Sequence, residues 1–338
     1  MKDILARFPI GAVHAVTPVR SGLMHQTQIV DADRGRYVLQ RLHPKLSTAE
    51  IIGDYAAVTA HLAARALPAP RLVPTTDGEP VAVDDEGLWW RLAPYVEGET
   101  REKVTSTAQA EQGARMLGRF HRAMADIEHV FASQHPLHDT EGHLARLRDA
   151  AINPRHASIC PRVADEIAAV FERLPPLLLP ADLPRRVVHG DPKISNVLFR
   201  GEEAVGLIDL DTCNVHTVLV DLGDAVRSWC RDGAEDEAQR FHVDRFEAIL
   251  RGYAAEGPKL TPAERAHLGG AGRLITLELA SRFARDVLED EYFGYDADRY
   301  ADRRSHNLAR ARGMLFLAAD MQAHREQIEQ LVVQYFGA

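Results

Sequence analysis

Cysteine, net positive charge and long apolar runs are all scarce in this chain of 338 residues. The three cysteines, Cys160, Cys213 and Cys230, form no C-x-x-C pair, and an odd number argues against a disulfide framework. No stretch has the ~18 unbroken apolar residues of a membrane-spanning helix. Residues 1–19 lack the apolar core of a signal peptide. The sequence therefore predicts a cytoplasmic protein with no membrane partner.

The formal net charge is −9, which argues against a general nucleic-acid binder because phosphate backbones are bound by basic surfaces. An acidic protein that binds an anionic nucleotide needs local Lys or Arg side chains and a divalent cation. Hydrophobic residues make up 46% of the chain and charged residues 26%, which is ordinary for a globular protein.

The pattern of the first ~95 residues predicts mainly strands. Residues 26–30 and 36–41 predict a hairpin, and residues 80–83 and 88–96 predict a second one. Between them, the capping box Ser47-Thr48-Ala49-Glu50 predicts the start of an amphipathic helix that ends near Ala66.

Beyond a polar, glycine-containing stretch at residues 97–100, the pattern changes to helices. We expect one lobe over residues 1–97, a hinge near 94–99, and a second, helical lobe over 98–338. Helical spacing is found in residues 107–127, 164–174, 243–256, 262–288 and 308–336, with breaks inside the longer ones. His138, Glu141 and His143 do not have H-E-x-x-H spacing, and we interpret them as residues of a turn-like, solvated loop.

One strand-rich segment of the second lobe, residues 186–208, carries the residues with the clearest chemical meaning. It contains H-x-D-x-x-x-x-N, then a hairpin turn, then a strand that ends in I-D-x-D. Asp191 follows a strand, Asn196 starts the next strand, and Asp209 ends the one after.

This set of residues suits phosphoryl transfer. An aspartate accepts or orients the proton of the attacking hydroxyl, while an asparagine and a second aspartate supply oxygen ligands to Mg²⁺ at the nucleotide phosphates. Asp191 is therefore the candidate base, Asn196 and Asp209 are candidate Mg²⁺ ligands, and Lys193 is placed to reach the transferring group. A structural hairpin is the alternative, since Asp and Asn form turns, but the two patterns in this strand context favour catalysis.

The segment resembles the catalytic loop and metal-binding segment of the aminoglycoside phosphotransferase and choline kinase superfamily. Within it, the chain looks closest to the N-acetylhexosamine 1-kinases. That closer likeness rests on residues 21–27 (S-G-L-M-H-Q-T), 37–41 (Y-V-L-Q-R), 221–227 (D-L-G-D-A-V-R) and 306–312 (H-N-L-A-R-A-R). The resemblance implies an α+β, two-lobed protein-kinase-like fold with a β-rich first lobe and a mainly helical second lobe.

The resemblance also implies roles for individual residues around ATP and Mg²⁺. It assigns nucleotide binding to Ser21, Gly22, Thr27, Arg41, Pro94, Tyr95 and Val96. It assigns the acceptor side to His25, Asp211, Asp224 and Arg310.

Two departures from the superfamily pattern concern the nucleotide. The first lobe has no G-x-G-x-x-G, so phosphate cradling would depend on Ser21 and Gly22. Arg41 stands where most of the superfamily has lysine, and its carboxylate partner is either Glu50 or Asp54.

The expected reaction is transfer of the γ-phosphate of ATP to a hydroxyl of a small molecule, with a sugar such as an N-acetylhexosamine, at its anomeric hydroxyl, as the first choice. One alternative keeps the reaction and changes the acceptor to an aminoglycoside or an amino alcohol such as choline or homoserine. Another is a pseudokinase that binds nucleotide without turnover. The sequence does not define the oligomeric state.

Overall fold

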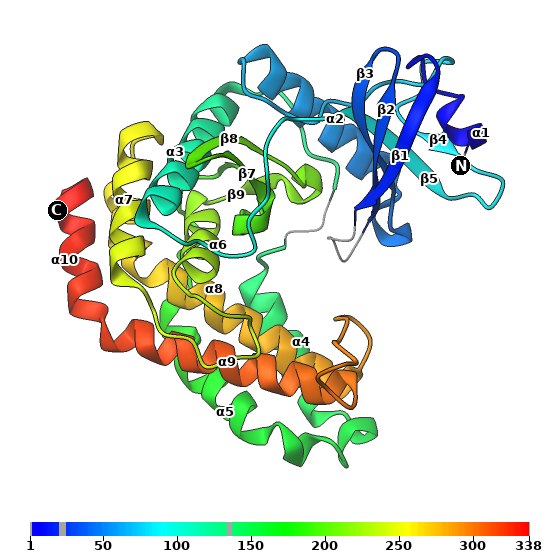
Figure 1. The fold of residues 1–338 in the computed structure, drawn as a ribbon. Coiled ribbons are helices and arrows are strands. Elements are labelled where there is room, and N and C mark those ends of the chain that lie inside the picture. Colours follow the sequence, from blue (N-terminus) through cyan, green and yellow to red (C-terminus); the bar gives the residue numbers. More distant parts are fainter. Residues whose placement is uncertain (1, 20–24, 134–136, 338) are drawn as a thin grey trace.

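A computed structural model describes residues 2–19, 25–133 and 137–337. Its first lobe is an antiparallel sheet with strand order β1-β2-β3-β5-β4, and its second lobe is mostly helical (Figure 1). The elements of the first lobe are α1 (Lys2–Leu5), β1 (Val13–Val19), β2 (Gln26–Ala32), β3 (Gly35–Arg41), α2 (Ala49–Ala64), β4 (Ala82–Val83) and β5 (Trp89–Pro94).

The two faces of this sheet have different neighbours. Because side chains alternate along a strand, Leu39 of β3 and Leu92 of β5, which are register partners, share one face. That face forms a small apolar core with α1, to which Ile4, Phe8 and Val30 also belong. The other face is therefore the one available to the second lobe.

Helix α2 begins one residue later than predicted. Thr48, not Ser47, is its N-cap and accepts a hydrogen bond from the Ile51 amide at 3.3 Å, whereas the Ser47 hydroxyl donates to the His43 carbonyl. The helix lies between the sheet and the second lobe in Figure 1. Its apolar side, which includes Tyr55 and Val58, joins the large core of the second lobe.

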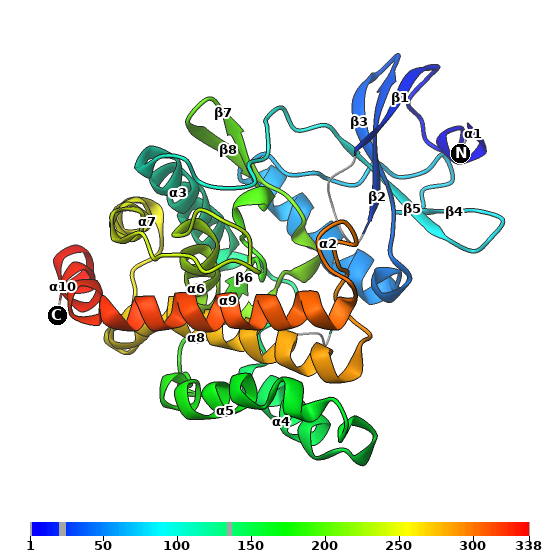
Figure 2. The same cartoon turned by 60° about the horizontal axis from the view of Figure 1, so that its bottom comes forward.

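The second lobe is built from long helices around one apolar core (Figure 2). The structure confirms the predicted helices near 107–127, 164–174, 243–256 and 262–288, and it divides residues 303–336 into two helices. The helices are α3 (Thr107–Ala123), α4 (Thr140–Ile152), α5 (Ala164–Arg173), α6 (Val218–Trp229), α7 (Val243–Glu256), α8 (Pro262–Glu289), α9 (Arg303–Ala323) and α10 (Arg325–Phe336).

The interpretation of residues 138–143 as a solvated loop is wrong. Helix α4 begins at Thr140, capped by the Asp139 side chain, which accepts from the Gly142 amide at 3.1 Å. His138 is buried and lies 2.9 Å from the Glu278 carboxylate of α8. Helices α6 and α4 were not predicted. In α6 every residue is buried, including the charged Asp221, Asp224 and Arg227, so its polar side also lies inside the protein.

The predicted strand-rich segment forms two small antiparallel ladders. They consist of β6 (Arg186–Val188) with β9 (Asn214–His216), and β7 (Val197–Arg200) with β8 (Glu203–Leu207). Glu99 pairs with Phe199 of β7 through two backbone hydrogen bonds of 2.8 Å, so the chain has joined the second lobe by residue 99. The predicted α+β, two-lobed, kinase-like fold is confirmed, and the lobe limits at 97 and 98 stay a prediction.

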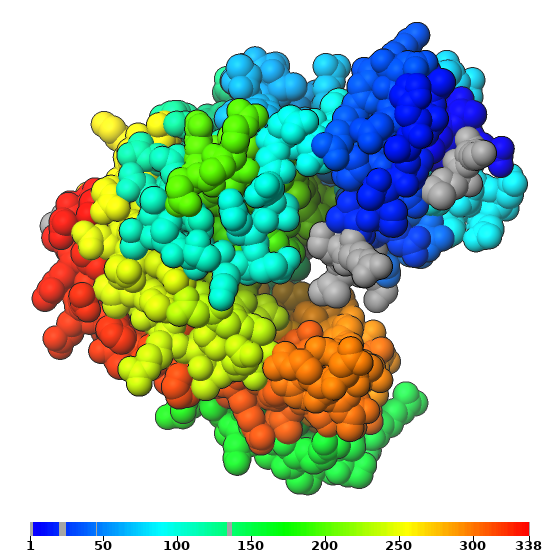
Figure 3. Space-filling model, viewed as in Figure 1, coloured from blue at the N-terminus to red at the C-terminus, as the bar shows by residue number. Residues whose placement is uncertain are grey.

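In the space-filling view of Figure 3, the molecule is hollowed between the blue first lobe and the orange segment near residue 300. Over the part of the chain that the structure describes, no helix combines the length and the apolar character that crossing a bilayer requires.

Candidate active site

The catalytic loop follows β6 and is held at its backbone. Gly190 has φ +87°, and a Cβ there would lie 2.5 Å from the Thr212 carbonyl oxygen, so glycine is required. The amides of His189 and Gly190 donate to the two oxygens of Asp221 in α6, at 2.7 and 2.8 Å. His121 of α3 contacts the same carboxylate at 2.8 Å. The loop therefore has a fixed conformation before any ligand binds.

The structure brings together the four residues predicted for phosphoryl transfer. Lys193 donates from Nζ to Oδ2 of Asp191. The Asn196 side-chain amide, at the end of η6 (Ile194–Asn196), donates to the Asp191 carbonyl at 2.8 Å, with weaker contacts to the carboxylates of Asp191 at 3.3 Å and Asp209 at 3.5 Å. Asparagine 196 thus lies between the candidate base and the second candidate metal ligand.

Asp209 lies where the chain turns from β8 into η7 (Leu210–Thr212). Its backbone is left-handed, with φ 65°, a conformation in which aspartate and asparagine are enriched among side chains larger than glycine. The turn brings ligand atoms of Asp209, Asp211 and His25 within 4.8 Å of one another.

The donor set fits a hard divalent cation such as Mg²⁺. Both oxygens of Asp211 accept from Arg91 of β5, at 2.5 and 2.6 Å, so Asp211 is already engaged. Asp209 is less engaged, since its carboxylate has a 3.5 Å contact with the Asn196 side-chain amide, and Asn196 lies beside it. A cation there would be held by the residues that the sequence predicts.

The charges of the site shift the pKa of its carboxyl groups in opposite directions. Burial raises the pKa of Asp191, the Lys193 ammonium lowers it, and the Asp224 and Asp209 carboxylates raise it, so that it lies above the usual aspartate value. Burial alone would raise the pKa of Asp211, but Arg91 and His25 hold it well below the usual range. Asp191 is therefore a stronger base than an exposed aspartate, and Asp211 is a permanent anion.

Among the residues predicted for the acceptor side, Asp224 of α6 has the most distinctive surroundings. Its Oδ1 accepts from Nε of Arg227 at 2.7 Å, whereas its buried Oδ2 has no hydrogen-bond partner among the described residues. His25 is buried, accepts from the His43 amide at 3.2 Å and lies 3.4 Å from Asp211. Arg310 donates to the Gly294 carbonyl at 2.7 Å and to the Asn307 side chain at 3.0 Å.

The structure describes only some of the residues predicted to bind the nucleotide. Ser21 and Gly22 lie outside the described residues. Thr27 of β2 accepts from the Gln40 side chain at 3.3 Å, on the sheet face opposite the α1 core. The Tyr95 amide donates to the Arg36 carbonyl at 2.9 Å and is not free for adenine, and a contact of adenine with another backbone group of Pro94, Tyr95 or Val96 stays a prediction.

The structure does not bring Arg41 to the catalytic residues. Strand alternation places it on the face of Leu39, and its guanidinium lies 6.0 Å from the centre of the Trp90 ring, in the α1-side core. Neither proposed carboxylate partner reaches it. Glu50 is exposed, and Asp54 accepts from the amides of residues 132 and 133 at 3.1 and 2.8 Å.

Three residues of the site were missed by sequence reasoning: Gln40, Arg91 and Asp221. Gln40 and Arg91 lie on facing strands, and only the register of β3 against β5 brings them together. Asp221 was noted as part of a family-like segment, and its position at the start of a buried helix was the available signal.

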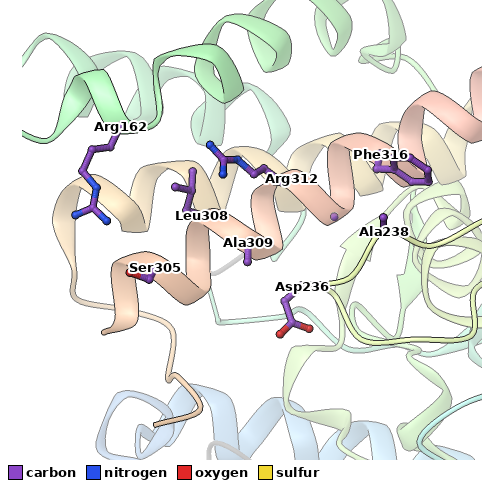
Figure 4. A pocket seen from close by; sticks show the side chains of 9 residues that line it. Arg162, Asp236, Ala238, Ser305, Leu308, Ala309, Arg312 and Phe316 are labelled. Atoms are coloured by element: carbon purple, nitrogen blue, oxygen red, sulfur yellow. The ribbon is translucent and has the colours of Figure 1, made fainter. Parts of the chain in front are cut away.

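A separate hollow lies along α9 (Figure 4). Ser305, Leu308, Ala309 and Arg312 line it from α9, and Asp236, in the loop before α7, is a further lining residue. None of the residues predicted for catalysis lines it.

Comparison with known proteins agrees with this geometry. Residues 15–258 match the model of the phosphotransferase enzyme family, abbreviated APH. The homoserine kinase of Zymomonas mobilis is 27% identical over 259 residues, covering 76% of either chain. That of Rhodopseudomonas palustris strain HaA2 is 28% identical over 301 residues, covering 86% of this chain and 84% of the relative.

Solved structures share the fold. An amicoumacin kinase in complex with AMP-PNP, Ca²⁺ and Ami superposes with a TM-score of 0.66 at 17% identity, covering 97% of this chain and 92% of the other. A microcompartment-associated aminopropanol kinase gives a TM-score of 0.66 at 16% identity, covering 97% of both chains. The closer likeness to N-acetylhexosamine kinases stays a prediction.

The family match and the homoserine kinase relatives identify an enzyme, an ATP-dependent kinase that phosphorylates a hydroxyl group of a small molecule. With a family model that matches 244 of its 338 residues (residues 15–258), this chain belongs to the phosphotransferase enzyme family.

Proposed function

We propose that this enzyme transfers the γ-phosphoryl group of MgATP to the hydroxyl of a small amino alcohol, with Asp191 as the base. The observation that supports the reaction is the cluster of Asp191, Lys193, Asn196 and Asp209, joined by hydrogen bonds of the side chains of Lys193 and Asn196. The observation that supports the acceptor class is the unpartnered Oδ2 of Asp224.

The reaction forms one bond and breaks another. The acceptor oxygen attacks the γ-phosphorus, the bond from that phosphorus to the bridging oxygen of ADP breaks, and the hydroxyl proton passes to the Asp191 carboxylate. Lys193 neutralises charge beside Asp191. Burial would lower the pKa of Lys193, but the Asp191 and Asp209 carboxylates raise it above the usual lysine value, so that it stays protonated. Asn196 and Asp209 would hold Mg²⁺, which supplies electrostatic stabilisation of the phosphate oxygens.

A buried carboxylate oxygen without a partner is costly unless a ligand satisfies it. Asp224 lies close enough to Asp191 for its charge to raise the pKa of that carboxyl, so it belongs to the same site. An ammonium group of the acceptor would supply the missing donor and a compensating charge. The homoserine kinase relatives, whose acceptor carries both an amino group and a hydroxyl, agree with this class.

A neutral sugar is the second candidate, as the resemblance implies. Its support from side chains is weaker than the sequence indicated, because Asp211 is bound by Arg91 and Arg310 is bound within the second lobe. The comparisons do not support a sugar acceptor.

The test is ADP release from MgATP with homoserine, aminopropanol, choline, aminoglycosides and N-acetylhexosamines as acceptors. Asp191→Asn is the inactive variant, and Asp182→Asn, at an exposed site of the second lobe, is the matched control. We expect turnover with an amino alcohol, a fall of at least about 10³-fold in Asp191→Asn, and no change in the control.

Each other outcome changes a different part of the proposal. Turnover only with N-acetylhexosamines would keep the mechanism and replace the acceptor. Mg²⁺-dependent nucleotide binding without turnover on any acceptor, equal in the wild type and Asp191→Asn, would support the pseudokinase instead.

A further inference from the structure

One arginine–aspartate pair connects the sheet of the first lobe to the metal-binding segment of the second. Arg91 of β5 donates from Nη1 and Nη2 to the two oxygens of Asp211, at 2.5 and 2.6 Å. Both side chains are 2% exposed. Asp211 lies in η7, two residues after the candidate metal ligand Asp209.

Two further contacts hold the guanidinium of Arg91 in place. Its Nε donates to the Gln40 side chain of β3 at 2.9 Å, and its central carbon lies 4.1 Å from the centre of the Tyr55 ring of α2. Burial would lower the pKa of Arg91, but Asp211 raises it above the usual arginine value, so the charge is permanent. This one side chain thus joins β3, β5, α2 and η7.

In kinases, strand β3 carries the lysine of the first lobe that serves the phosphates. Here the β3 residue on the face toward Arg91 is Gln40, and the next residue, Arg41, lies on the opposite face with Trp90. The other cation of β3 on that face, Arg36, lies at the far end of the strand, where its Nε is 3.4 Å from the Asp31 carboxylate and its guanidinium lies over the Tyr95 ring. The sheet supplies a cation from β5 instead, and Gln40 accepts a hydrogen bond from it.

We propose that Arg91 is a positioning residue for phosphoryl transfer, acting through Asp211 to fix the Asp209 segment against the sheet of the first lobe. The proposal rests on the proposed function in one respect, that Asp209 holds the cation of MgATP. A bidentate pair between a planar guanidinium and a carboxylate fixes orientation as well as distance. Among the described residues, loss of the pair would leave His25, 3.4 Å from Asp211, as the first-lobe side chain that still contacts this carboxylate.

The test compares this pair with a second arginine–aspartate pair between the same lobes. Arg65 at the end of α2 contacts Asp126 of η2 (Met124–Asp126), but these side chains are 41% and 64% exposed. The variants are Arg91→Met, Asp211→Asn, the double variant, and Arg91→Lys. The control is the double variant Arg65→Met with Asp126→Asn.

Two readouts separate this proposal from the proposed function. The first is binding of ADP by calorimetry, with and without Mg²⁺ and without any acceptor. The second is kcat and its Mg²⁺ dependence with an acceptor that turns over. Because loss of an outer residue behind a metal ligand typically costs about 10- to 100-fold in metal affinity or activity, we expect a loss of at least about tenfold in Mg²⁺-dependent affinity for ADP in Arg91→Met and in Asp211→Asn. Metal-free affinity should change little.

The double variant should be no worse than either single variant, because both remove the same connection. Arg91→Lys, which keeps the charge and is the variant to use if Arg91→Met does not fold, should lie between the wild type and Arg91→Met. The control should stay within about twofold, since exposed pairs contribute little.

Two results would overturn the proposal. One is a folded Arg91→Met or Arg91→Lys protein with wild-type Mg²⁺ dependence of ADP binding. The other is a double variant that regains wild-type kcat and Mg²⁺ dependence, because the pair would then only compensate two buried charges. A failure of every acceptor would concern the proposed function alone, since the binding readout needs none.

Discussion

The two halves of the active site differ in how the chain assembles them. In the second lobe, Asp191, Lys193, Asn196 and Asp209 lie within 19 residues of sequence, and hydrogen bonds of 2.7 and 2.8 Å hold the backbone at His189 and Asp191. In the first lobe, Thr27, Gln40 and Arg91 come from three strands, and only strand register brings them to one face. The second-lobe half of the site is a local motif, whereas the first-lobe half is a product of tertiary structure.

After loss of the base itself, the largest effect is expected from the residue of α6 that fixes the catalytic loop. Asp221→Asn replaces an oxygen that accepts a backbone amide with an NH₂ group, which leaves a buried donor unpaired near His189 or Gly190. We expect about 1–3 kcal/mol lower stability and a fall in kcat on the order of 10²-fold. Thermal unfolding and ADP release measure the two effects. Wild-type kcat in this variant would show that the loop does not depend on α6.

A smaller effect should follow from the loss of a metal ligand in the same half. Asn196→Ala removes the side chain between Asp191 and Asp209. We expect the Mg²⁺ concentration that gives half-maximal rate to rise at least about tenfold, because one oxygen ligand is lost. A Mg²⁺ titration of initial rate checks this. An unchanged midpoint would remove Asn196 from the metal site.

The pH dependence of the reaction reports the charges around Asp191. Its raised pKa places the acid limb of kcat/KM above the usual aspartate range, since the base must be ionised. Lys193→Met removes the cation that lowers this pKa, so the limb should move to higher pH, by about one unit. The pH profile of the residual activity measures it. A limb that moves to lower pH would mean that another group titrates.

The smallest effect should come from the first-lobe residue that sequence reasoning chose. Arg41→Met should change the KM for ATP by less than about twofold, because this side chain lies on the α1 side of the sheet. Steady-state kinetics at varied ATP concentration test it against Arg91→Met. A tenfold rise in the KM for ATP in Arg41→Met, without a rise in Arg91→Met, would restore the sequence-based assignment of Arg41 to the nucleotide. It would also contradict the assignment of the first-lobe cation to β5 instead of β3.

These contrasts also explain how far the sequence could be interpreted. The two-lobed fold, both first-lobe hairpins and the cluster from Asp191 to Asp209 follow from alternation, turns and spacing, which are local. Arg41 was assigned to the phosphates from its resemblance to the lysine position of the superfamily, whereas the face that a strand residue occupies depends on a register that one residue can invert.

The roles of Arg91 and Asp221 could not be predicted from local sequence, because their partners lie far away along the chain. Arg91 meets Asp211 across 120 residues of sequence. Asp221 acts on a loop 31 to 32 residues before it. Helix α4 was missed because its capping residue Asp139 stands among histidines that suggested a loop.

The scarcity of cysteine has a practical consequence for measuring lobe movement. Cys213 and Cys230 are buried, and burial raises the pKa of both thiols well above the usual value, so they should be inert toward alkylating dyes. Cys160, in η4 (Cys160–Arg162) of the second lobe, is half-buried and is the remaining thiol of the three. A second cysteine introduced on the exposed turn before β5, for example at Glu86, would create a donor–acceptor pair across the lobes for energy-transfer experiments without removing a native residue of the site.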